Sequence, residues 1–141
     1  MLFRSQRIGL DRKSGIDLPL EARGAMVNRQ DFIKIREYPA TTAFGQGGFS
    51  LTPIQLTTMT ASLANGGKSV VPHLVEGLFN GRGIQQNKLT IPEPRQIFSP
   101  ETADTVLKMM ETVVTNKSGS GGKAKICGYR VAGKTDRKSV V

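Results

Sequence analysis

Apolar residues recur with the period of a helix in two parts of the chain. The first part follows Thr52, whose side chain suits a helix N-cap, and Pro53, which suits the first helical position. Gln55 completes a capping box with Thr52, and residues 65–67 (Asn-Gly-Gly) supply a left-handed stop. We therefore predict a helix between these signals, with one apolar face formed by Ile54, Leu56, Met59, Leu63 and Ala64.

A second helix is predicted within residues 99–116 by the same signals. Ser99 suits the N-cap, Pro100 the first helical position, and Glu101 the positive end of the helix dipole. The apolar positions predict one buried stripe, made of Ala103, Val106, Met110, Val113 and Val114.

The rest of the chain has the pattern of short strands and loops. Residues 69–79 and 95–99 are rich in apolar and β-branched residues, which predicts strands, and the polar stretch between them predicts a turn. Gly-rich residues 116–125 predict a flexible loop, and residues 129–134 alternate as a strand does. Helices and strands without a regular βαβ rhythm favour an α+β fold.

Composition limits the kinds of site and partner that we expect for this chain. The chain has one cysteine and one histidine, so an internal disulfide is excluded and a metal site is not expected, nor is any cofactor. The net charge is +9, but the basic residues are scattered and no aromatic residues are interleaved with them, so nucleic acid is not an expected partner. No apolar run approaches the ~20 residues that span a bilayer.

Three local patterns could carry chemistry, and none has the context that its chemistry needs. Gly128–Thr135 fits the phosphate-loop pattern G-x-x-x-x-G-K-[ST], but a loop precedes it and no helix-length segment follows. Ser120–Lys123 fits Ser-x-x-Lys, but the two glycines between Ser and Lys disfavour the helical turn that would join them. His73 is expected to be a packed or edge residue, because nothing near it in sequence would orient it for catalysis.

Taken together, several longer stretches resemble the C-terminal half of a penicillin-binding protein transpeptidase domain, closest to the class B, monofunctional peptidoglycan D,D-transpeptidases. The resemblance covers residues from about 8 to 135 in the family's order. It rests on GIDLPLEARG (15–24), TAFGQGGFSLTPIQLTTMTASLANGG (42–67), VVPHLV (70–75), SPETADTVLKMMETVV (99–114) and GSGGKAKICGYRVAGKT (119–135).

The resemblance implies the penicillin-binding protein and serine β-lactamase-like fold, an antiparallel sheet with flanking helices, and a serine acyl-transfer reaction. It places the family's third motif, Lys-Thr-Gly, at residues 134–136 on an edge strand. Lys134 would then be catalytic and would bind the substrate carboxylate together with Thr135. Asp136 stands where the family has Gly. The nucleophile is not in this chain, because Ser-x-x-Lys and Ser-x-Asn are expected upstream of Met1.

The resemblance also implies partners and a location. Peptidoglycan stem peptides and β-lactams would bind, and proteins of cell elongation or division would associate. An N-terminal anchor, expected in the parent protein but missing from this chain, would hold the domain at the inner (plasma) membrane, facing the periplasm or cell exterior. We expect residues 1–135 to be transpeptidase domain. Residues 136–141, DRKSVV, match a translated sequencing adapter, so we interpret them as a non-native tail. The fragment alone is expected to be inactive.

Other interpretations remain open at this point. The surplus of basic residues could indicate a non-catalytic module that binds nucleic acid or an anionic wall polymer. A P-loop nucleotidase would use Gly128–Thr135. A β-lactamase or carboxypeptidase shares the Lys-Thr-Gly chemistry, although GIDLP and the GQG and TPIQL stretches resemble the transpeptidases more.

Overall fold

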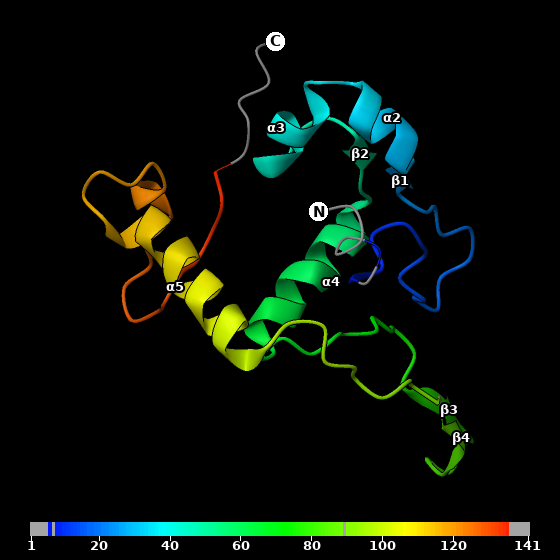
Figure 1. Cartoon of the computed structure of the whole chain (residues 1–141). Coiled ribbons are helices and arrows are strands. Elements are labelled where there is room, and N and C mark those ends of the chain that lie inside the picture. The colour runs from blue at the N-terminus through cyan, green and yellow to red at the C-terminus, as the bar shows by residue number, and fades with distance from the viewer. Residues whose placement is uncertain (1–5, 7, 89, 136–141) are drawn as a thin grey trace.

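The computed structural model describes residue 6 and residues 8–88 and 90–135. The two small sheets are both antiparallel and two-stranded, and with the helices they confirm the α+β class. Figure 1 shows an open arrangement in which helices α4 and α5 meet near the end of α4 and the start of α5. In chain order the elements are β1 (Ala25–Met26), α2 (Arg29–Lys34), α3 (Tyr38–Ala43), β2 (Phe49–Ser50), α4 (Pro53–Ala64), β3 (Gly77–Phe79), β4 (Gln85–Lys88), α5 (Pro100–Thr115) and the 3-10 helix η1 (Gly122–Ala124).

Helix α4 begins as predicted but buries a different face. The Thr52 hydroxyl accepts a hydrogen bond from Gln55 N, and Gln55 Oε1 accepts one from Thr52 N, which confirms the capping box. The buried side chains are Gln55 and Ser62, whereas Leu56 is 51% exposed. The predicted apolar face is therefore wrong for Leu56 and Ala64, which are both exposed, because segments packed against α4 select the polar side. The other three residues of that face are half-buried.

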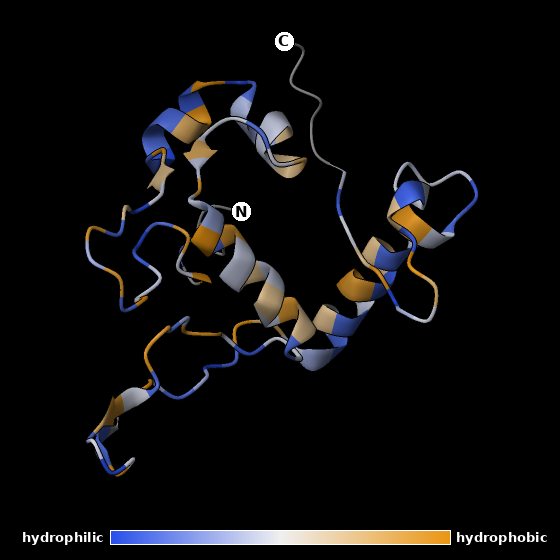
Figure 2. Cartoon of the chain, turned by 180° about the vertical axis from the view of Figure 1, so that it is seen from behind, coloured by the Kyte–Doolittle hydropathy of each residue, from blue (hydrophilic) through white to orange (hydrophobic). Residues whose placement is uncertain are grey.

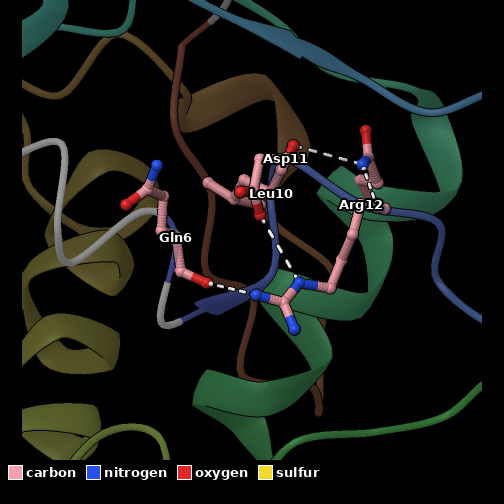
Figure 3. Close-up of polar contacts among 5 residues, drawn as sticks. Gln6, Leu10, Asp11 and Arg12 are labelled. Carbon is pink, nitrogen blue, oxygen red and sulfur yellow. Dashed lines mark hydrogen bonds and ion pairs between the residues drawn. The ribbon is translucent and has the colours of Figure 1, made fainter. Parts of the chain in front are cut away.

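The N-terminal segment explains this choice of face. Gln55 Nε2 donates to the backbone oxygens of Leu10 (3.2 Å) and Arg12 (2.7 Å), so the glutamine holds that segment against α4. Figure 3 shows Leu10, Asp11 and Arg12 in this region, with the Arg12 side chain reaching the Gln6 carbonyl. Gly24 is buried here, and a Cβ on it would lie 2.6 Å from Ser50 O, so only glycine allows this close approach.

Helix α5 matches its prediction closely. Ser99 accepts a hydrogen bond from Thr102 N and Pro100 is the first helical residue. Ala103 is fully buried and Val114 is 5% exposed. The remaining stripe residues, Val106, Met110 and Val113, are half-buried. The predicted stripe is confirmed, and part of it lies against α4.

Sequence patterns did not predict the elements between residues 25 and 50. β1 pairs with β2 in the register Ala25↔Ser50 and Met26↔Phe49. Between them, Asn28 caps α2 by accepting from Asp31 N at 2.8 Å. Helices α2 and α3 are six residues each, too short to show an apolar period.

The predicted strands are only partly formed. Within residues 69–79 only β3 is a strand, and within 95–99 only Gln96 pairs, in an isolated bridge with Lys68. The predicted turn contains β4, which pairs with β3 across a short turn held by the Asn80 side chain. Extended backbone forms a strand only where a neighbour supplies a ladder of hydrogen bonds. Residues 95–98 bond to Gly67 and Ser69, but the pairing with this neighbour is limited to the one isolated bridge.

Much apolar surface is exposed. The accessible area is 11088 Å², whereas a compact protein of this mass would expose about 7,100 Å². Figure 2 shows hydrophobic residues distributed over the helices and loops and on the projecting β3–β4 hairpin. No helix in the described part of the chain is both long and apolar enough to cross a membrane. The most exposed large side chains include Leu20, Ile33, Leu74, Leu78 and Tyr129.

Candidate functional site

The candidate site lies on the segment that follows η1 and returns along helix α5 (Figure 1). Lys134 and Thr135 are both exposed on it. Lys134 Nζ donates a hydrogen bond to the backbone oxygen of Thr135 at 2.7 Å. The Lys134 ammonium group thus lies at the backbone of Thr135, and both residues are exposed.

The chain reverses direction after α5 through a turn that packs on the C-terminal end of this helix. Gly121 N donates to Val113 O at 2.9 Å, and Gly119 N donates to Asn116 O at 2.9 Å. A Cβ on Gly119 would collide with the carbonyl oxygen of Val113, and one on Gly121 would lie 3.0 Å from the same oxygen. The glycines of the predicted flexible loop are therefore needed for close contact between this turn and the helix.

Two contacts then attach the segment to α5. Arg130 Nη2 lies 2.7 Å from Glu111 Oε1, and Gly133 N donates to Met110 O at 3.1 Å. The hydrogen bond from Arg130 to Glu111 and the attraction between their charges raise the pKa of Arg130. Sequence reasoning missed both anchors, because nothing in the local pattern links Glu111 to a residue nineteen positions later.

The predicted strand at residues 129–134 is not formed. Residues 130–135 lie alongside a helix and have no strand partner among the described residues. A helix offers few free backbone groups to an extended neighbour, so Gly133 makes a single backbone bond to it. The prediction is thus wrong about strand pairing: Gly133 N bonds to Met110 O, and Thr135 O accepts from Lys134 Nζ, so these two groups beside Lys134 already have partners within the chain.

The three local patterns that lacked the required sequence context also lack the secondary structure that their chemistry needs. Ser120 is in a turn and Lys123 is in η1, so the pair has no α-helical turn between them, as expected. Residues 125–127 before Gly128 form no strand, which agrees with rejecting a phosphate loop. His73 is exposed, with Nδ1 3.4 Å from Val71 O, and the expectation of a packed or edge histidine is wrong, because its segment is neither covered nor paired.

Two carboxylates brace the GIDLPLEARG stretch. Asp17 accepts hydrogen bonds from the backbone of Val75 (2.7 Å) and Leu74 (2.8 Å), and these bonds lower its pKa. Glu21 accepts from the Ser14 hydroxyl at 2.6 Å, which lowers the Glu21 pKa. Both groups are committed to backbone and hydroxyl donors within the chain, so their role is structural.

A cavity of about 300 Å³ lies beside the polar face of α4, far along the chain from the candidate site. Its lining includes Gln55, Thr58 and Ser62, and no residue between 116 and 135. These three side chains already hydrogen-bond within the chain. We therefore place the candidate site at Lys134 and Thr135, where an ammonium group and a hydroxyl are exposed.

Comparison with known proteins covers the same residues. The family model described as the penicillin binding protein transpeptidase domain matches residues 5–135. The peptidoglycan D,D-transpeptidase FtsI homolog of Mesostigma viride is 35% identical over 147 aligned positions, which cover 92% of this chain and 24% of the relative. The peptidoglycan D,D-transpeptidase MrdA of Acinetobacter baumannii is 30% identical, covering 96% of this chain and 21% of that protein.

Solved structures agree with the sequence relatives. Penicillin binding protein 3 of Mycobacterium tuberculosis has a TM-score of 0.76 at 28% identity, covering 91% of this chain and 29% of that one. A D,D-transpeptidase domain from Eggerthella lenta has a TM-score of 0.77 at 26% identity, covering 94% of this chain and 34% of that one. The chain thus spans about a quarter of the curated relatives and about a third of the solved chains.

Proposed function

The chain belongs to the family of penicillin-binding protein transpeptidase domains, and from this premise we propose that it is part of a peptidoglycan D,D-transpeptidase. Its role is to supply Lys134 and Thr135, which bind the carboxylate of the stem peptide. The observation that carries the proposal is the family match over residues 5–135, which runs through both residues. The exposure of Lys134 and of the next residue, Thr135, supports it.

The proposed reaction is acyl transfer through a serine of the parent protein. The serine oxygen attacks the carbonyl of the penultimate D-Ala, and the terminal D-Ala leaves with a proton on its nitrogen. The acyl group then passes from the serine to an amine of a neighbouring peptidoglycan strand. Lys134 supplies a positive charge for the terminal carboxylate and Thr135 donates a hydroxyl hydrogen bond to it. The substrate backbone lies along residues 130–135, beside the exposed Lys134 and Thr135.

We propose that the chain alone does not react with penicillin. Its one Ser-x-x-Lys match, Ser120–Lys123, spans a turn and η1 rather than an α-helical turn, and Ser-x-Asn does not occur in the sequence. The proposal assigns residues 1–135 to the transpeptidase domain and 136–141 to a non-native tail. Lys134 is thus a substrate-binding residue here and becomes catalytic only beside the parent's nucleophile.

Ligands and location follow from the same proposal. A structurally similar protein, penicillin binding protein 3 of Mycobacterium tuberculosis, has been solved with ampicillin, which supports β-lactams as ligands of the parent. Relatives named FtsI homolog and MrdA support peptidoglycan synthesis in cell division or elongation. We place the parent at the inner (plasma) membrane, with this domain outside the cytoplasm, where peptidoglycan is cross-linked.

Carboxylate recognition can be tested on the purified chain by NMR. Titration with a peptide ending in D-Ala-D-Ala should shift the signals of Lys134 and Thr135, and the same peptide ending in an amide should not. Exposed Lys125 is the matched control, because it lies on the same basic stretch but away from the two anchors. Shifts of equal size at Lys125 and Lys134 would refute the assignment. A covalent adduct with fluorescent penicillin would refute the claim that the nucleophile lies elsewhere.

A basic binding module is the second candidate, favoured by one observation. Residues 116–135 contain five basic residues and no acidic one, and Lys117, Lys123 and Lys125 have no ion pair within the described part of the chain. Affinity for duplex DNA that falls steeply with salt would support this candidate. Absence of binding at low salt would remove it.

A further inference from the structure

The segment that carries Lys134 has few restraints of its own. Between η1 and Arg130, the side chains of Ile126 and Tyr129 are 56% and 75% exposed, so packing does not hold this part of the return. Tyr129 N bonds only locally, to Ile126 O at 3.2 Å. Among the described residues, the polar contacts that hold the segment before Lys134 are therefore the two with α5, and half-buried Val131 lies between them in the sequence.

Both contacts fall on consecutive residues of α5. Gly133 bonds to Met110 O, and Arg130 pairs with Glu111. Glu111 is rooted in a regular part of the helix and its side chain is only 24% exposed, whereas the Arg130 side chain is 78% exposed. The carboxylate is thus the fixed member of the pair and the guanidinium is the member that it holds.

We propose that Glu111 is a positioning residue, which fixes Lys134 and Thr135 for carboxylate binding by holding Arg130 against α5. The proposal rests on the proposed function for its consequence, although the restraint itself does not depend on it. Arg130 and Gly133 are three residues apart, and in extended backbone they span about 10 Å. Two attachments at that separation fix the direction of the segment, whereas Gly133 alone would act as a pivot.

Hydrogen exchange of the Gly133 amide measures this restraint directly. We expect Glu111→Gln to raise the exchange rate of Gly133 roughly two- to fivefold, because the charge that holds Arg130 is lost. The matched control is Asp104→Asn, which breaks the exposed Asp104–Lys108 pair on the same helix. Because Asp104 makes no hydrogen bond to Arg130 and attracts it only weakly through charge, this change should affect Gly133 much less than Glu111→Gln. Equal exchange rates in both variants would overturn the proposal.

A charge reversal separates positioning from a general loss of helix stability. The double variant Glu111→Lys with Arg130→Glu restores an ion pair and should restore slow exchange at Gly133, whereas each single variant should not. If Glu111→Gln also speeds exchange at Ala103 and Val106, the helix itself is weakened, and Arg130→Gln then provides the test. Unchanged Gly133 exchange in Arg130→Gln would contradict the proposal.

The same samples distinguish this inference from the proposed function. In Glu111→Gln, the D-Ala-D-Ala peptide should shift the Lys134 signal less than in the unchanged chain at the same peptide concentration. If the unchanged chain shows no selective shift, the proposed function fails while the exchange result still decides the restraint. If the shift is selective but identical in Glu111→Gln, the positioning role is wrong and the proposed function stands.

Discussion

Helices α4 and α5 begin in the same way and yet bury opposite kinds of residue. Each has a hydroxyl N-cap followed by proline, at Thr52-Pro53 and Ser99-Pro100. α5 buries Ala103 and Val114, whereas α4 buries Gln55 and Ser62. The start of a helix is set by local residues, but the buried face is set by the segments that pack on it.

The difference has an energetic reason. In α5 apolar burial is enough, because the helix contacts the end of α4 near its own start and η1 near its own end. In α4 the inner face meets backbone carbonyls of the N-terminal segment, which must keep hydrogen bonds when buried. Gln55 bonds to these carbonyls and also caps its own helix, so one side chain stabilises both the buried contact and the helix start.

The largest effect is expected for Gln55→Ala. This change leaves Leu10 O, Arg12 O and Thr52 N without a buried partner, and should lower the free energy of unfolding by about 3 kcal/mol. Urea denaturation followed by circular dichroism would measure it. Gln30→Ala on the exposed face of α2 is the control, with less than about 0.5 kcal/mol expected. Equal effects of the two changes would break the comparison.

Val114→Ala tests the apolar side of the comparison. Val114 is 5% exposed, so the change should cost about 2 kcal/mol through lost burial and a small cavity. Met109→Ala on the same helix removes a side chain that is 63% exposed and should cost much less. If Met109→Ala destabilised the chain as much in the same denaturation experiment, α5 would not be held by its apolar stripe.

The shared N-caps allow a direct test of local equivalence. Thr52→Ala and Ser99→Ala should each cost about 1 kcal/mol. The two losses should be similar, because each change removes a hydroxyl that accepts from one N–H of the first turn, while Gln55 Oε1 keeps its bond from the backbone N of residue 52. Melting temperatures of the two variants would compare them. A clear loss in one variant and none in the other would contradict this local equivalence.

The smallest effect is expected at Leu20, whose backbone conformation is one that leucine disfavours. At the two helix starts, by contrast, the residues present favour the conformation that they adopt. Leu20 has φ of 61° and is 99% exposed. Glycine adopts this backbone without steric cost, so Leu20→Gly should stabilise the chain by about 0.5 kcal/mol after the entropy of the unfolded chain is counted. Leu18→Gly, at a residue without positive φ, should destabilise it. A loss of stability in both variants would show that Leu20 is held by contacts.

Sequence reasoning succeeded where structure is local. Both long helices, their caps and the α5 stripe follow from spacing and from a few residues such as Thr52, Gln55 and Ser99. The short elements α2, α3, β1 and β2 could not be predicted in this way, because pairs such as Ala25 and Ser50 meet only in three dimensions. The segment 129–134 fails as a predicted strand for the same reason.

The candidate site divides in the same way. Lys134 and Thr135 were identified from sequence by family resemblance, and their roles remain proposals. Their anchors, Glu111 and Arg130, were not identified, because an ion pair between distant residues leaves no periodic signal. The resemblance points to Lys134 and Thr135, and the structure adds the contacts that attach their segment to α5.

Sequencing the locus from genomic DNA tests the central claim most directly. The account predicts an open reading frame that continues upstream of Met1 with Ser-x-x-Lys and then Ser-x-Asn, and that has Gly in place of Asp136. A stop codon immediately upstream of Met1, together with a confirmed Asp136 and a stop after Val141, would contradict it.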